Sequence, residues 1–309
     1  MESRMKRSAP PSTTAAVVAS TQLALAHHPR LGSLVDPRSA KLIQRALTAT
    51  YPRLSQIFEP ATTRRILPLA LAAERLLSPG FIAYYALRKT GVRMELARAV
   101  ESGFHQIVLV GAGLDMLSAS LPLREGLTVI EVDHPATQRA KLDALRGDPS
   151  IDSITSVGVD LASTSLQQAL AACSSFDSRR DTVFVAEGVF MYLSPEAVEG
   201  VFESMRVSST ARNRLIISVV SPDARGRVRL HSQSRAVDVC MTLLGETFKW
   251  GLRPDEVARF LRARGWSLDV VHTTDDLRMR FLDPVDAARV PDTGEMLVVA
   301  TASRGGSMA

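Results

Sequence analysis

The sequence predicts an α/β fold, in which a mostly parallel sheet follows a helical N-terminal region. From residue 104 onward, short segments rich in Val and Ile alternate with helical segments, which is the pattern of right-handed βαβ units. These strands are almost continuously apolar, as expected when helices cover both faces of a sheet. The first hundred residues contain no such strands and are typical of helices instead.

Composition excludes several classes of protein. The 309 residues are 46% hydrophobic and 22% charged, the profile of an ordinary globular protein. No apolar run reaches about 18 residues, so we expect no membrane span. The two cysteines form no CxxC pair, which favours a cytoplasmic protein without a zinc site or other metal. No Lys/Arg run is interleaved with aromatic residues, so we expect no nucleic-acid partner.

The N-terminal third is predicted to form a helical cap over residues 13–103, after a disordered tail at residues 1–12. Its basic tail lacks the apolar segment of a secretory signal. Asp36 is a typical N-cap, and Pro37 fits the first position of a helix. Pro68 interrupts an otherwise helical segment. The four predicted helices cover residues 13–28, 36–50, 62–77 and 78–103.

The α/β core is predicted over residues 104–303, with seven strands. The last two have no long helix between them, which predicts a hairpin whose final strand runs antiparallel to the rest. Between the earlier strands, helices are expected over residues 114–122, 135–145, 165–172 and 194–206, and a further helix over 253–265. The seven strands are predicted over residues 105–111, 127–133, 154–160, 182–188, 214–220, 266–273 and 295–303.

A glycine turn follows the first strand, in "IVLVGAGLDM" at residues 107–116. In open α/β sheets, ligands bind beyond the carboxyl ends of the strands, and glycine lets the backbone approach a ligand closely. Gly111 and Gly113 therefore predict a cofactor site. Met116 stands where a dinucleotide fingerprint has its third glycine, which disfavours a pyrophosphate.

Acidic residues end the next strands. Glu131 lies 20 residues past Gly111 and Asp133 two further, where an acidic side chain typically accepts hydrogen bonds from a ribose. Asp133 alternatively caps the next helix, as does Asp160 in "VDLAS". Glu187 ends an apolar strand, where burial without a cation would cost several kcal/mol. A ligand with a ribose, an amino group and no pyrophosphate fits this pattern, and S-adenosylmethionine is one.

Four blocks resemble one family in order and spacing: "QIVLVGAGLDM", "IEVDHPATQRAK", "VDLAS" and "VFVAEGVFMYLSPEAV". They are similar to the leucine carboxyl methyltransferase family, which includes bacterial O-methyltransferases of the polyketide carboxyl-methylating type. The resemblance spans roughly residues 13–301. It implies a class I methyltransferase with a Rossmann-like sheet of seven strands, the last antiparallel, an N-terminal helical cap and S-adenosyl-L-methionine as cofactor.

The resemblance also implies roles at the methionyl end of that cofactor. Arg88 is expected to grip the cofactor carboxylate, since a guanidinium fork suits bidentate pairing. The alternative is a solvated helix arginine. Gly111 and Gly113 are expected to lie under the methionyl group, and Glu187 to face its amino end.

At the adenosine end, the resemblance implies that Asp133 takes the ribose hydroxyls and that Asp160 and Leu161 contact adenine. The sequence departs from the family beside the turn. Many relatives continue "GAGLD" with a Thr-Arg pair, whereas this chain has Met116 and Leu117. Polar contacts at that point are therefore not carried over.

The chemistry implied is methyl transfer to a carboxylate or hydroxyl of a small molecule in specialised metabolism. A carboxylate is ionised at neutral pH and needs no base, whereas a phenol, with a pKa of about 10, does. None of the six histidines lies in a distinctive motif, so no catalytic residue is assigned, which favours a carboxylate. Two alternatives stay open: a catalytically silent cofactor-binding relative, and a nicotinamide-dependent oxidoreductase.

Residues 222–250 are predicted to form a helical insertion over the active face, because they exceed an ordinary connection. Arg225, Arg227 and Arg229 alternate within it, and Arg235 follows. Such a stretch is either a solvated surface or a lid that presents guanidinium groups to an anionic acceptor. Under the second interpretation, the partner is an anionic small molecule.

Overall fold

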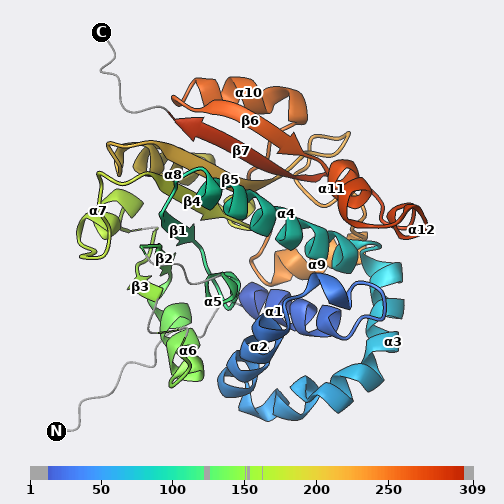
Figure 1. The fold of residues 1–309 in the computed structure, drawn as a ribbon. Coiled ribbons are helices and arrows are strands. Elements are labelled where there is room, and N and C mark those ends of the chain that lie inside the picture. The colour runs from blue at the N-terminus through green and yellow to red at the C-terminus, as the bar shows by residue number, and fades with distance from the viewer. Residues whose placement is uncertain (1–12, 122–125, 150, 152–153, 162, 303–309) are drawn as a thin grey trace, which may run out of the picture.

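The computed structural model describes residues 13–121, 126–149, 151, 154–161 and 163–302, so the predicted tail at residues 1–12 lies outside the described residues. Seven strands form one sheet in the order β3-β2-β1-β4-β5-β7-β6 (Figure 1). The strands are β1 (Gln106–Val110), β2 (Thr128–Asp133), β3 (Ile154–Gly158), β4 (Thr182–Ala186), β5 (Asn213–Val220), β6 (Ser267–His272) and β7 (Glu295–Ala302).

Helices precede the sheet and alternate with its strands. Before β1 lie α1 (Thr13–Ala26), α2 (Pro37–Thr50), α3 (Pro60–Leu77) and α4 (Phe81–Glu101), with short 3₁₀ turns η1 (Gly32–Leu34) and η2 (Pro52–Phe58). The later helices are α5 (Leu117–Ser120), α6 (Pro135–Leu145), α7 (Leu166–Ala171), α8 (Pro195–Val207), α9 (Arg235–Leu243), α10 (Pro254–Arg262), α11 (Thr274–Phe281) and α12 (Pro284–Ala287), with a 3₁₀ turn η3 (Phe190–Tyr192) after β4.

The predicted direction of the strands is confirmed. β1 pairs in parallel with β2 and β4, β2 with β3, and β4 with β5. β7 runs antiparallel to both of its neighbours, β5 and β6. The connection between β6 and β7 is not a tight hairpin, because it contains α11 and α12. Thr273 caps α11 by accepting a hydrogen bond from the Asp276 amide, a capping box that marks a helix start.

Both faces of the sheet are covered, as the apolar strands predicted. Along β1, Val108 and Val110 face a core shared with α7, α8 and α10. The alternate residues Ile107 and Leu109 face a second core with α4. In Figure 1, α4 lies along the sheet and α10 beside β6. The two-residue alternation of a strand therefore divides one apolar run between two layers.

Of the N-terminal helices, α1 and α2 begin where the sequence indicated, whereas α3 begins two residues earlier and α4 three residues later than predicted. Asp36 caps α2 by accepting a hydrogen bond from the Ser39 amide at 2.7 Å, and Pro37 is the first helical residue. Pro68 lies inside α3, which continues through it to Leu77. Among the described helices, no single one is long and apolar enough to cross a membrane. Taken together, α3 and α4 have the length and composition of a membrane span, but the pair is bent by 95° between the two helices.

Candidate cofactor site

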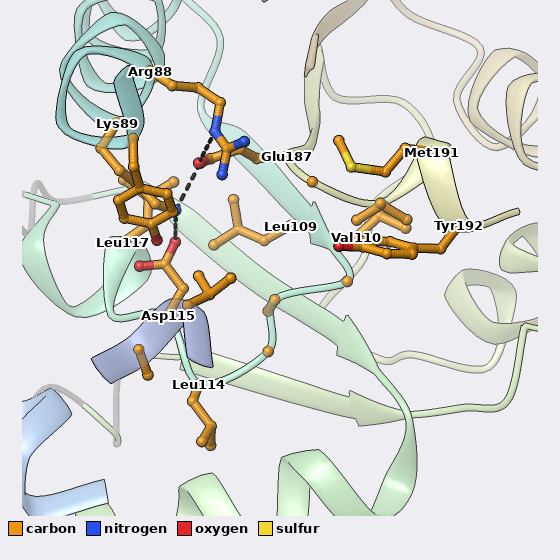
Figure 2. Close-up of a pocket in the computed structure, with 18 of the residues that line it drawn as sticks. Arg88, Lys89, Leu109, Val110, Leu114, Asp115, Leu117, Glu187, Met191 and Tyr192 are labelled. Carbon is orange, nitrogen blue, oxygen red and sulfur yellow. Dashed lines mark hydrogen bonds and ion pairs between the residues drawn. The ribbon is translucent and has the colours of Figure 1, made fainter. Parts of the chain in front are cut away.

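A cavity of about 350 Å³ lies at the carboxyl ends of β1, β2 and β4. This volume is in the range of small-molecule sites, roughly 300–1,000 Å³, and its position is where open α/β sheets bind ligands. Figure 2 shows side chains from α4, from the turn after β1 and from η3 projecting toward one space. Five of the seven predicted cofactor residues line it: Arg88, Gly111, Gly113, Asp133 and Glu187.

The glycine turn needs its glycines for backbone reasons. Gly111 and Gly113 have φ angles of 69° and 55°, a region that L side chains rarely adopt. A Cβ on Gly111 would also lie 2.4 Å from Cγ2 of Val189. Met116, which replaces the third glycine of a dinucleotide site, is fully buried in the core shared with α1 and α2. The turn therefore closes on an apolar side chain.

Asp133 holds the glycine turn to the end of β2. Its Oδ2 accepts a hydrogen bond from the Gly113 amide at 2.5 Å, and its Oδ1 accepts one from the His134 amide at 2.6 Å. The N-cap of α6 is His134, so the interpretation of Asp133 as a helix cap is wrong. Burial raises the pKa of Asp133, and the two amides partly oppose this effect. An ionised carboxylate has about four acceptor positions, so two remain for a ligand.

Arg88 is buried and bridges two carboxylates. Its Nε donates to Glu187 at 2.8 Å, and its Nη1 donates to both oxygens of Glu295 at 2.8 Å. Arg88 is 7% exposed, so the solvated-arginine alternative is wrong. Two of its three nitrogens are thus engaged within the protein, which leaves Nη2 for a ligand carboxylate in place of a free fork. The predicted grip on the cofactor stays a prediction.

Lys89 completes this buried network. Its Nζ donates to Glu187 at 2.7 Å and to Asp115 (Figure 2). Asp115 also accepts from Gln22 of α1 at 3.1 Å. The cations that pair with Glu187 are therefore two side chains of α4. The sequence had instead predicted the amino group of the ligand as its partner. The network ties the N-terminal helices to the ends of β1, β4 and β7.

Three members of the network escaped sequence reasoning, although signals for them exist. Asp115 stands inside the "GAGLD" block and Lys89 beside Arg88. Glu295 begins an apolar strand, and it pairs with Val220 at the end of β5 because β7 is antiparallel. The first residue of an antiparallel strand lies at the carboxyl edge of its parallel neighbours. An acidic residue there is a signal for this site.

Asp160 and Leu161 follow β3 and are not among the residues that line the described cavity. Leu161 packs, partly buried, against the core of α7 and α8. Asp160 is exposed, and its backbone carbonyl accepts from the Ser163 and Thr164 amides. Ser165, and not Asp160, caps α7. The adenine contacts stay a prediction.

The insertion reaches the cavity. Leu230, Glu246 and Phe248 line it, while α9 within the insertion has no buried residue. The four arginines that suggested an anionic acceptor do not line this cavity. Arg227 pairs with Asp223 at 2.9 Å and Arg229 with Asp238 at 2.6 Å.

Comparison with known proteins decides the family. The sequence profile described as "Leucine carboxyl methyltransferase" matches residues 13–206, more than half of the chain. The chain belongs to the leucine carboxyl methyltransferase family. This confirms the resemblance read from the four sequence blocks.

Two relatives are provisionally named S-adenosyl-L-methionine-dependent methyltransferases. One, from Mycolicibacterium paratuberculosis, is 32% identical over 191 residues, which are 55% of this chain and 56% of the relative. The chain thus spans about half the length of this relative. Another, from Mycobacteroides abscessus, is 28% identical over 283 residues, 88% of each chain.

A solved structure shares the fold. It is a methyltransferase, also provisionally named, from Thermobifida fusca YX. It is 17% identical, with a TM-score of 0.54 over 78% of this chain and 88% of that one. Together with the strand order, this likeness confirms the class I methyltransferase fold that the sequence predicted.

The structure describes all six histidines of this chain, and none of them lines the cavity. His134 caps α6, and His272 lies 3.0 Å from Glu95 in a buried pair. Among the described residues, no group of three or more His, Cys, Asp or Glu side chains is placed to hold a metal ion. No histidine base is therefore assigned.

Acid is expected to weaken the network through Asp115. Burial opposes ionisation of this carboxyl, but Lys89, Gln22 and Lys141 outweigh it and lower the pKa from 3.8 to about 2. A depressed pKa stabilises the fold above the unfolded value, and this contribution is lost as pH falls through the folded value. The contribution is about 2 kcal/mol. The loss is expected between about pH 4 and pH 2.

Urea unfolding of the Asp115→Asn variant against the parent measures this contribution. The difference in free energy of unfolding should be about 2 kcal/mol at pH 6 and shrink toward pH 2. The control is Asp143→Asn, which removes a 59% exposed partner of Arg146 and should change stability by less than about 1 kcal/mol. A difference for Asp115→Asn that does not change with pH would contradict the assignment.

Proposed function

We propose that this chain is an S-adenosylmethionine-dependent O-methyltransferase that acts on a carboxylate or hydroxyl of a small molecule in specialised metabolism. One observation carries the proposal: the glycine turn, fastened by Asp133 to the end of β2, lines a cavity at the carboxyl edge of the sheet. Membership of the family and the provisional names of the relatives support it.

The donor set of the cavity fits this cofactor. Asp133 has acceptor positions left for the two ribose hydroxyls. Five carboxylates line the cavity against the two cations Arg88 and Lys89. S-adenosylmethionine carries a sulfonium and an ammonium against one carboxylate, so this excess of negative charge suits it. Arg88 Nη2 would meet the cofactor carboxylate and Glu187 its ammonium, while Asp160 and Leu161 would hold adenine.

When bound, the cofactor supplies an activated methyl group on a sulfonium. The protein has to align the acceptor oxygen with it and exclude water. The rigid turn at Gly111 fixes one wall of the cavity, and the insertion closes another with Leu230 and Phe248. The buried ion pairs of Glu187 with Arg88 and Lys89 hold these charged side chains in place, so they need not reorganise during the reaction.

Isothermal titration calorimetry tests the proposal. S-adenosylhomocysteine is expected to bind with micromolar affinity, and NADH is expected not to bind. A chain that binds NADH and not S-adenosylhomocysteine would instead be an oxidoreductase. Methyl transfer from labelled S-adenosylmethionine to a library of small molecules then separates an enzyme from a catalytically silent relative, which binds the cofactor but labels no acceptor.

A further inference from the structure

Beyond the proposed cofactor residues, the cavity continues into an apolar chamber. We define this acceptor chamber by the residues Phe81, Met191, Tyr192, Leu230 and Phe248. The Tyr192 and Phe248 rings meet edge to face with their centroids 5.2 Å apart, and all five residues belong to one apolar cluster. In Figure 2, Met191 and Tyr192 lie across the cavity from Lys89 and Asp115. Three aromatic rings favour a flat, apolar ligand.

The cavity offers no uncommitted ammonium or fully free guanidinium to an anionic acceptor. Among the described lining residues, the only cations are Arg88 and Lys89. Arg88 bonds to Glu187 and Glu295, and Lys89 to Asp115 and Glu187. Both belong to the network at the cofactor end. An acceptor carboxylate in the chamber would therefore lose its hydration without gaining a counter-ion from the protein, so only the cofactor sulfonium would oppose its charge.

Glu246 adds negative charge to the chamber. It lines the cavity beside Phe248 and also lines a second, adjoining hollow with Arg229 and Met241. Arg229 and Gln233 of that hollow are bonded to Asp238 instead, and within the part of the chain that the structure describes the Glu246 carboxylate has no hydrogen-bond or ion-pair partner. An unpaired carboxylate repels an anion over several ångströms at the effective dielectric constant of a protein surface.

Tyr192 supplies a neutral hydrogen-bond donor. Burial raises the pKa of its hydroxyl, and Glu246 and Glu295 raise it further, so the group stays protonated. Figure 2 shows this ring projecting into the cavity. A phenol hydroxyl can donate to an uncharged oxygen and can also accept from a hydroxyl. The chamber thus combines an apolar wall, one neutral hydroxyl and one free carboxylate.

We propose that the acceptor is a flat, apolar molecule that presents an uncharged hydroxyl, and that Glu246 excludes carboxylate acceptors. This proposal rests on the proposed methyltransferase function, and it departs from the anionic acceptor expected from the sequence. In the reaction, a bond forms between the hydroxyl oxygen and the methyl carbon. The bond between that carbon and sulfur breaks, its electron pair stays on sulfur, and the hydroxyl proton passes to water.

Two probes with one ring system test the charge preference of the chamber: 2-naphthol and 2-naphthoate. Their binding is measured by calorimetry on the full chain saturated with S-adenosylhomocysteine. The parent is expected to bind 2-naphthol at least about ten-fold more tightly than 2-naphthoate. In Glu246→Gln, which changes the charge and keeps the shape, this gap should shrink to about three-fold or less. In Glu246→Lys, which places a positive charge at the chamber, it should reverse.

Glu101→Gln is the matched control, since Glu101 is exposed at the end of α4 outside the cavity, and it should leave the gap unchanged. Equal binding of the two probes to the parent, no binding of 2-naphthol, or a gap that persists in Glu246→Gln would overturn the proposal. Titration with S-adenosylhomocysteine alone reports on the proposed function. If S-adenosylhomocysteine does not bind, titration of the unliganded protein with 2-naphthol and 2-naphthoate still measures which charge state the chamber prefers.

Discussion

Asp133→Ala is expected to lower the affinity for S-adenosylhomocysteine by at least about 100-fold. In the proposed assignment, the ribose would lose two charge-assisted hydrogen bonds to this carboxylate, each worth about 1.5–3 kcal/mol. The substitution would also release the Gly113 amide, which Asp133 now holds at 2.5 Å. The free glycine turn would then have to be ordered by the ligand, which costs further affinity. Calorimetry on the parent and the variant measures the loss.

Asp133→Asn separates the two effects. An amide keeps one oxygen that can accept from the Gly113 amide, so the turn should stay in place while the charge is lost. We expect an affinity between those of Asp133→Ala and the parent. The control is Asp143→Asn, an exposed carboxylate on α6, which should bind like the parent. Unchanged affinity in a folded Asp133→Ala variant would remove the ribose assignment.

Arg88→Met should destabilise the fold by about 3–5 kcal/mol, the cost of breaking a buried ion pair by removing one partner. Glu295 is 3% exposed and would lose both of its hydrogen bonds to Arg88. Glu187 would keep only Lys89. Urea unfolding at neutral pH measures the change. Arg206→Ala, which breaks an exposed pair with Glu203, should cost less than about 1 kcal/mol.

Two further variants distinguish the ion pair from simple loss of packing. Arg88→Met combined with Glu295→Met should be more stable than Arg88→Met alone, because no unpaired carboxylate is left at the start of β7. Arg88→Lys should retain part of the stability, since a single ammonium keeps the charge but cannot bond to Glu187 and Glu295 through separate nitrogens as the guanidinium does. A double variant no more stable than Arg88→Met would show that packing, and not charge, dominates.

Sequence patterns predicted the layers of the fold because they are local. The alternation of Val-rich strands with helices, the Asp36–Pro37 helix start and the glycines at positions 111 and 113 each act through backbone preference or through burial of neighbouring residues. The connection between β6 and β7 was predicted less well. Its helices α11 and α12 are short and polar, so their apolar periodicity is weak.

The candidate site was predicted in part for the same reason. Gly111, Gly113 and Asp133 lie in contiguous motifs at strand ends, and all three line the cavity. The pairing of Arg88 and Glu187 with their partners was not predicted, because it joins distant segments: Arg88 and Glu295 are 207 residues apart in the chain. Only the antiparallel placement of β7 brings Glu295 to the carboxyl edge of the sheet.

By itself, the sequence determined the family, the order of the seven strands and of the main helices before β6, and the turn that faces the cavity, because each is encoded in contiguous residues. The tertiary structure decided which charges are already paired. It committed Arg88 and Lys89 to three carboxylates and placed Glu246 beside the aromatic wall. Charge pairing depends on distances across elements that lie far apart in the chain, and the acceptor that we propose for the chamber follows from it.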